Sequence, residues 1–124
     1  MNASRFEVYK FSIVMKTKKT FLNGLPELLL LQVLSREEMY GYQLIAEIRA
    51  RSGEVFNLSE GSIYPILHRL VTEKHIVTRR EIVNGRPRHY YRTSAKGQKH
   101  VAQLTGEWNR MVAGANAILG AQYA

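Results

Sequence analysis

The chain has 124 residues, of which 45% are hydrophobic and 23% charged, a composition that supports one folded domain with its own core and excludes a disordered tail. Its formal net charge of +8 favours a polyanionic partner, either nucleic acid or an anionic membrane surface. The absence of cysteine excludes disulfides, thiolate catalysis and zinc sites built from cysteine.

The N-terminal part of the chain imitates a secretory signal, because basic residues after Met15 lead into a run of leucines. Glu27 and Gln32 interrupt that run, no small-x-small cleavage site follows, and the leucines are too few to span a bilayer. We therefore expect a buried helix and no membrane segment. Residues 1–14 have no clear period and Met15 offers an alternative start site, so residues 1–20 are expected to be an extension, helical or poorly ordered.

Two helices are predicted in the first half of the chain. Residues 25–35 predict the first, with Pro26 in its first turn, where the missing N–H costs nothing. Residues 36–53 contain the second, which should end near Gly53. The side chains expected on its buried face are Tyr42, Leu44, Ile45 and Ile48. The short apolar stretch 54–58 is expected to be a lone edge strand.

A third helix is predicted to run to about Lys74. Its apolar residues at the spacing of one helical face are Ile63, Ile66, Leu67, Leu70 and Val71. Either Ser59 or Ser62 can cap its start. Behind a Ser62 cap, Pro65 is the third helical residue and no hydrogen bond is lost; behind a Ser59 cap, one hydrogen bond is forfeited and a kink is expected. The opposite face carries Ser62, Tyr64, Pro65, His68 and Arg69.

A hairpin and a long helix complete the chain. Residues 76–83 alternate and are β-branched, and residues 86–94 return as a second strand after Asn84-Gly85, a pair that tolerates the positive φ of a tight turn. Ser94 is expected to cap the final helix. Apolar residues at three- and four-residue spacing predict the core of a helix–helix interface there; they are Val101, Leu104, Trp108, Met111, Ala115 and Ile118.

The order of these elements predicts a mainly α fold with a small β hairpin. Three helices followed by a two-stranded ribbon form a winged helix-turn-helix, expected over residues 21–93, and residues 94–124 are expected to form a C-terminal dimerisation helix. In such a fold the second helix of the pair enters the major groove of DNA and reads base edges with its N-terminal residues. The polar face of the third helix is therefore a candidate reading surface, although a solvated helix face is the competing interpretation.

The hairpin favours nucleic acid over that competing interpretation. Its arginines, against the single acid Glu81, are Arg79, Arg80, Arg86, Arg88 and Arg92. A basic tip stiffened by Pro87 suits phosphate or minor-groove contact, whereas a hairpin edge protected by charge is the alternative. Tyr90 and Tyr91 point to opposite faces of their strand, so one is expected in the core and the other towards DNA or the third helix.

Enzymatic interpretations find little support. The four histidines lack metal-ligand spacing, the carboxylates are scattered, and no nucleophile elbow, phosphate-binding glycine loop or dinucleotide fingerprint is present. We expect no enzyme, no metal site and no cofactor. Trp108 is expected either to fill the core of the helix interface or to line a hydrophobic effector pocket there.

Three motifs in order, MYGYQL, GSIYPILHRL and HYY followed by AKG, resemble the PadR family of transcriptional regulators. The resemblance extends from about Leu22 to Val112. It implies a cytoplasmic, homodimeric winged-helix repressor that binds double-stranded DNA at a pseudo-palindromic operator, dimerises through its C-terminal helix and is released by a small-molecule effector.

By position and pattern together, the residues expected to bind DNA are Tyr40, Gly41, Ser59, Ser62, Tyr64, Pro65, His68, Arg69, Asn84, Gly85, Arg86 and Arg88. Three residues depart from the family pattern. Ser62 stands where threonine is more usual, His89 where a basic residue is common, and His75 where a glycine usually follows Lys74. A glycine there would end the third helix in the left-handed conformation, which histidine adopts less readily.

A competing hypothesis comes from another functional class. A winged helix can serve as a protein-interaction module, here docking through the apolar C-terminal helix, with the basic hairpin as ordinary surface. Convergence of Arg69, Arg86 and Arg88 on one face would favour DNA as the partner, and their dispersal would favour the interaction module.

Overall fold

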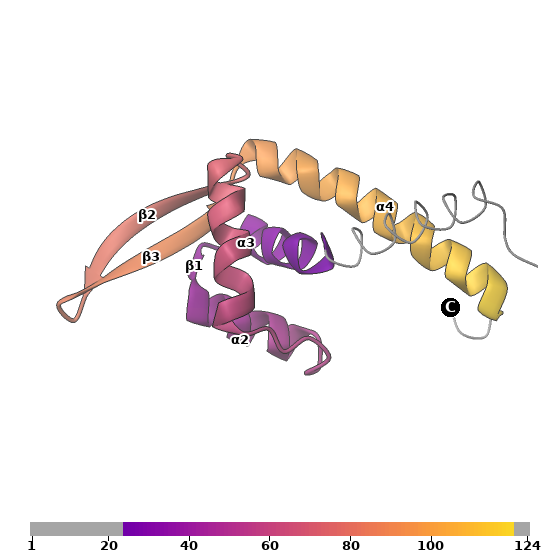
Figure 1. Cartoon of the computed structure of the whole chain (residues 1–124), viewed down its shortest axis with the longest axis horizontal. Helices are drawn as coiled ribbons and strands as arrows, with labels where there is room; N and C mark the ends of the chain where they lie inside the picture. Colours follow the sequence, from indigo (N-terminus) through magenta and orange to yellow (C-terminus); the bar gives the residue numbers. More distant parts are fainter. Residues whose placement is uncertain (1–23, 121–124) are drawn as a thin grey trace, which may run out of the picture.

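The computed structural model describes residues 24–120, and the expected extension over residues 1–20 lies outside them. In chain order the elements are the first helix (described over residues 24–36), β1 (Met39–Tyr40), α2 (Gly41–Arg51), α3 (Glu60–Thr72), β2 (Ile76–Val83), β3 (Arg86–Thr93) and α4 (Ala95–Leu119). Figure 1 shows the hairpin and α4 projecting in opposite directions from the body formed by the other helices. This is the predicted winged helix-turn-helix with a long C-terminal helix, so the fold class is confirmed.

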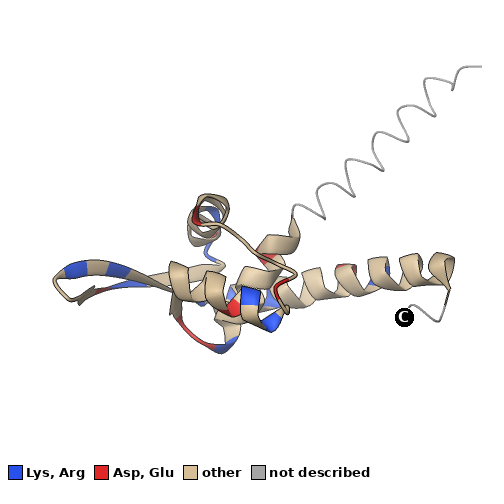
Figure 2. Cartoon of the chain, turned by 90° about the horizontal axis from the view of Figure 1, so that it is seen from below, with Lys and Arg blue, Asp and Glu red and all other residues tan. Residues whose placement is uncertain are grey.

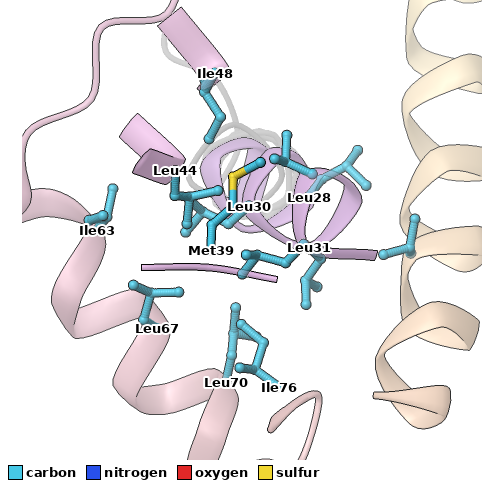
Figure 3. Close-up of a cluster of buried hydrophobic side chains, with 13 residues drawn as sticks. Leu28, Leu30, Leu31, Met39, Leu44, Ile48, Ile63, Leu67, Leu70 and Ile76 are labelled. Atoms are coloured by element: carbon cyan, nitrogen blue, oxygen red, sulfur yellow. The ribbon is translucent and has the colours of Figure 1, made fainter. Parts of the chain in front are cut away.

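The core lies where the first helix, α2 and α3 meet (Figure 3). The leucine run of the first helix is confirmed as buried, since Leu30, Leu31 and Leu34 have no exposed surface. Each buried leucine side chain stabilises the fold by about 1.5–3 kcal/mol before opposing entropy is counted. Thr93 is also buried, and its hydroxyl donates to the Leu31 carbonyl over 2.7 Å, which ties β3 to the first helix. Between residues 24 and 120, no helix combines the length and hydropathy needed to cross a bilayer.

The second helix begins later than predicted. Met39 and Tyr40 form the short strand β1, which the sequence did not predict, and α2 starts only at Gly41. Its end is confirmed, because Gly53 follows with a φ of 60°. The expectation that Tyr42 is a core residue is wrong: its side chain is 66% exposed. A helix that starts at Gly41 turns Leu44 inward, and Tyr42 two residues earlier faces solvent.

The predicted edge strand at residues 54–58 is also wrong, because that stretch is a loop. Its place in the sheet is taken by β1, which pairs antiparallel with β3 through Met39↔Tyr91 and Tyr40↔Tyr90. The apolar residues of the loop instead pack against the core, and the Ser52 hydroxyl accepts a hydrogen bond from the backbone N–H of the loop residue Phe56. Burial, not strand pairing, accounts for the apolar composition of the loop.

The start of α3 is determined by both candidate serines. Ser59 is the cap: its hydroxyl accepts from the Ser62 N–H at 3.2 Å, and the Ser62 hydroxyl accepts from the Ser59 N–H at 3.1 Å. This reciprocal arrangement is a capping box. Pro65 therefore lies inside the helix, where its missing N–H leaves the Gly61 carbonyl without the usual donor four residues on. The helix nevertheless continues to Thr72.

The end of α3 corrects the expectation for His75. Lys74, with a φ of 66°, is the left-handed residue, so the glycine-like position lies one residue earlier than predicted. The Lys74 N–H donates to the Val71 carbonyl and the His75 N–H to the Leu70 carbonyl, the two bonds of a Schellman motif. This motif leaves His75 in an ordinary backbone conformation, directed towards the start of α4.

The hairpin and the last helix are built as predicted. Asn84 and Gly85 have φ values of 53° and 77°, which a two-residue hairpin turn of this kind requires. Ser94 caps α4, its hydroxyl accepting from the Gly97 N–H at 3.0 Å. Within the described residues the strands form one antiparallel sheet in the order β1-β3-β2.

Candidate nucleic-acid interface

The exposed N-terminal half of α3 lies against the start of α2. A Cβ on Gly41 would lie 2.5 Å from the Tyr64 hydroxyl oxygen, so glycine at this position allows the tyrosine to pack across the end of α2. Tyr64 remains 42% exposed, and the neighbouring Ser62 and Pro65 are exposed as well. Backbone N–H groups at a helix start attract phosphate, so two helix ends with polar side chains meet on one surface.

Arg88 of the hairpin reaches this surface through a stack of side chains. Its guanidinium lies 4.2 Å from the centre of the Tyr40 ring, and Tyr40 meets Tyr90 edge-on with ring centres 5.7 Å apart. A guanidinium stacked on a ring keeps its N–H edge available for phosphate. The structure thus brings together the predicted residues at the start of α2, at the start of α3 and in β3.

The other face of the hairpin lines an open groove against α3. The residues lining this groove are Tyr64, Pro65, His68, Arg69, Val71, Thr78, His89 and Tyr91. Tyr91 is therefore the tyrosine that faces α3, and Tyr90 lies on the opposite face. Burial, with a smaller contribution from Tyr64, raises the pKa of Tyr91.

Arg80 pairs with His89 across the strands, and both are candidates that the predicted set of DNA-binding residues did not include. Strand alternation counted back from the Asn84-Gly85 turn places both on the α3-facing side of the hairpin. That alternation was available in the sequence and could have identified them. The turn residues themselves are exposed at the tip.

Arg69 does not join the basic residues of the hairpin. Its guanidinium pairs with Glu27 at 3.1 Å and with Glu73 at 2.9 Å. Arg86 and Arg88 lie on the hairpin face opposite to the groove that Arg69 lines. The three arginines therefore do not converge on one face. Figure 2 shows Lys and Arg positions along the hairpin itself, so the positive charge of this surface comes mainly from the hairpin.

The apolar series of α4 divides into two parts. Val101 is 8% exposed and belongs to the core of its own chain, and Leu104 and Trp108 pack partly buried against that core. Met111 is half-buried, whereas Ala115 is exposed and Ile118 is 88% exposed. The second half of the series is thus the part of α4 whose apolar surface is open to another molecule.

Two stacked histidines join the end of α3 to α4. The rings of His75 and His100 are parallel within 5° at a centroid distance of 4.3 Å. Glu73 lies 3.5 Å from His75 Nδ1, a buried atom with no hydrogen-bond partner among the described residues, and Glu27 lies 3.7 Å from His100 Nε2. Burial lowers the pKa of His75, as do His100 and Lys96, against the opposite effect of the two carboxylates. No group of residues in the described part of the chain is arranged to hold a metal ion.

This lowered pKa predicts a loss of stability in mild acid. An unfolded histidine titrates at about pH 6.5, and folded His75 titrates lower, so its contribution is fully present above about pH 6.5 and is lost as the pH falls towards the folded pKa. Urea unfolding at about pH 7.5 and about pH 5.5 should show a smaller loss for His75→Gln than for the unsubstituted protein. Equal losses in the two proteins would contradict the prediction.

Comparison with known proteins places this geometry in context. Residues 30–103 match the model of the Transcriptional regulator PadR-like family. A transcriptional regulator of Mycobacterium tuberculosis is 34% identical over 85 residues, which cover 68% of this chain and 74% of that protein. A PadR-like transcriptional regulator from Bacillus cereus superposes with a TM-score of 0.67 at 32% identity, covering 81% of this chain and 96% of that one. A transcriptional regulator from Clostridium thermocellum has a TM-score of 0.74 at 22% identity, covering 82% and 99%.

Proposed function

The chain belongs to the PadR-like family of transcriptional regulators, and from this we propose that it is a homodimeric repressor released from its DNA operator by a small-molecule effector. The observation that carries DNA binding is the surface on which the starts of α2 and α3 meet Arg88 of the hairpin. A cytoplasmic location is part of the proposal, because a regulator has to reach its DNA.

In this proposal the first turns of α3 enter the major groove. The hydroxyls of Ser62 and Tyr64 bond base edges or phosphates, and the start of α2 at Tyr40 receives a phosphate. Arg86 lies near the hairpin tip, where a side chain can enter the adjacent minor groove. Arg88, stacked on Tyr40, is oriented towards the DNA backbone.

A second copy of the chain is proposed to cover the open half of α4. Ile118 and Leu119 are 88% and 62% exposed, an unfavourable state for large apolar side chains that pairing with another α4 would relieve. A symmetric dimer presents two reading helices, so half-sites are expected about 10 base pairs apart, or a multiple of this. An effector bound beside Trp108, at the boundary between the core and the open half of α4, would change the spacing of these helices.

The test is a fluorescence-polarisation titration with labelled duplex from the promoter of the protein's own gene. A dimer that neutralises about six phosphates should lose about a thousandfold in affinity between about 50 and 200 mM salt. A flat salt response, or no binding at low salt, would overturn the proposal. Size-exclusion chromatography with light scattering on the same sample tests the dimer separately.

The protein-interaction module is the second candidate function. Two observations favour it: the exposed apolar end of α4, and the pairing of Arg69 with carboxylates away from the hairpin arginines. It predicts that Ile118→Ser abolishes self-association or partner binding while the chain binds no DNA at low salt. DNA binding that is lost together with dimerisation in Ile118→Ser would instead support the repressor.

A further inference from the structure

A forked ion pair joins the base of the hairpin to the loop before β1. Arg79 Nε donates to both oxygens of Glu38, at 2.8 and 2.9 Å, and Arg79 Nη2 lies 2.7 Å from Glu38 Oε1. The hydrogen bond from Arg79 lowers the pKa of Glu38, so the carboxylate stays charged near neutral pH. An exposed pair of this kind contributes little to global stability, but its forked geometry restricts orientation.

The ion pair continues into a line of stacked side chains. The Arg79 guanidinium lies 4.5 Å from the centre of the Tyr90 ring, Tyr90 packs edge-on against Tyr40, and Arg88 stacks on Tyr40. We call these residues the wing strap: Glu38, Arg79, Tyr90, Tyr40 and Arg88. One end of the strap is a carboxylate in the helical body, and the other is an arginine of the proposed DNA surface.

Little else determines the angle of the hairpin. β1 and β3 pair through only two residues each, and Figure 1 shows the hairpin extending away from the body beyond that point. From Arg79 to the turn at Asn84 the strand spans about 17 Å, so a rotation of about 10° at its base would move the tip by about 3 Å. A hydrogen bond to phosphate does not survive such a displacement.

We propose that Glu38 and Arg79 are positioning residues that hold the hairpin at the angle at which its arginines reach DNA while α3 occupies the groove. This inference rests on the proposed DNA-binding function and adds residues that need not touch DNA. An acid acquires a positive role in binding a polyanion, which charge alone would not give it.

The sign of one substitution separates this inference from its rivals. Glu38→Gln removes a negative charge, so a purely electrostatic account predicts tighter DNA binding. Tighter binding is also expected if Arg79 contacts phosphate directly and Glu38 competes for it. Positioning predicts weaker binding, by roughly fivefold to tenfold, the effect of losing about one phosphate contact at moderate salt.

The matched control is Glu37→Gln, the same change in charge one residue earlier. Glu37 is exposed, and its substitution should leave affinity unchanged or slightly tighter. Arg79→Lys keeps the charge but loses the fork, and should weaken binding as Glu38→Gln does. The slope of log affinity against log salt should fall by about one in both weakened variants, an effect that partial unfolding of a fraction of the sample does not produce.

The measurement is polarisation of the labelled promoter duplex with the full chain, alongside thermal unfolding of each variant. Weaker binding by Glu38→Gln and Arg79→Lys at unchanged melting temperature supports the strap. Binding by Glu38→Gln as tight as that of the unsubstituted protein, or tighter, overturns it while leaving the repressor proposal intact. Failure of the unsubstituted protein and Glu37→Gln to bind at low salt overturns both.

Discussion

Gly97→Ala is expected to destabilise the fold by about 2–3 kcal/mol, within the range measured for overpacked cores. A Cβ at this position would collide with the backbone carbonyl oxygen of His75 and lie 2.7 Å from Thr93 Cγ2. The His75 carbonyl cannot rotate away cheaply, because it accepts the Ser94 N–H at 2.9 Å. The start of α4 must therefore shift away from the end of α3. Urea unfolding followed by circular dichroism measures the loss.

The same substitution further along α4 is the control. A Cβ added to Gly114 would meet no other side chain or distant backbone atom of the described chain within 4 Å, so Gly114→Ala should stabilise the helix by about 0.5–1 kcal/mol through helix propensity alone. Opposite signs for the two substitutions attribute the first effect to the close contact with His75. A loss of stability at Gly114, reduced on dilution, would show instead that this glycine permits close packing of two α4 helices.

The combined change Arg86→Ala and Arg88→Ala is expected to weaken DNA binding by about a hundredfold at moderate salt, because each arginine removed forfeits about one phosphate contact. Phosphate contacts carry no sequence information, so operator and scrambled duplexes should lose affinity to a similar extent. The slope of log affinity against log salt should fall by about two. Polarisation titrations at several salt concentrations provide all three quantities.

The matched control removes two positive charges from α4. Lys99 and Arg110 are exposed there, and Figure 1 shows that α4 extends away from the hairpin. Lys99→Ala with Arg110→Ala should weaken binding much less than the hairpin pair. Equal losses would mean that net charge, not the placement of the hairpin, determines affinity.

Much of the fold was predictable because its determinants are local. The leucine helix, the inward face of α3 and the alternating strands follow from side-chain period, and the hairpin turn follows from the positive φ tolerated by Asn84-Gly85. Ser94 caps α4 through its own hydroxyl. Each of these features involves residues within a few positions of one another, so the sequence alone contains the relevant chemistry.

The candidate site depended more on the tertiary structure. Strand β1 has two residues and no pattern of its own, and it exists because β3 offers it a pairing edge. The partner of Arg69 in the first helix, Glu27, lies far back in the chain, as Glu38 does from Arg79, and no periodicity links either pair. The exposure of Tyr42 follows from where α2 starts, which that same strand decides.

By itself the sequence determined which helices and strands form, the hairpin turn and the motifs that resemble one family of regulators, because turn chemistry and hydrophobic period act over short distances. Only the tertiary structure decided which arginines are held by carboxylates and which remain with the hairpin. It also decided that Val101 belongs to the core while Ile118 stays open. Those outcomes depend on contacts between residues distant in the chain, which local propensity does not specify.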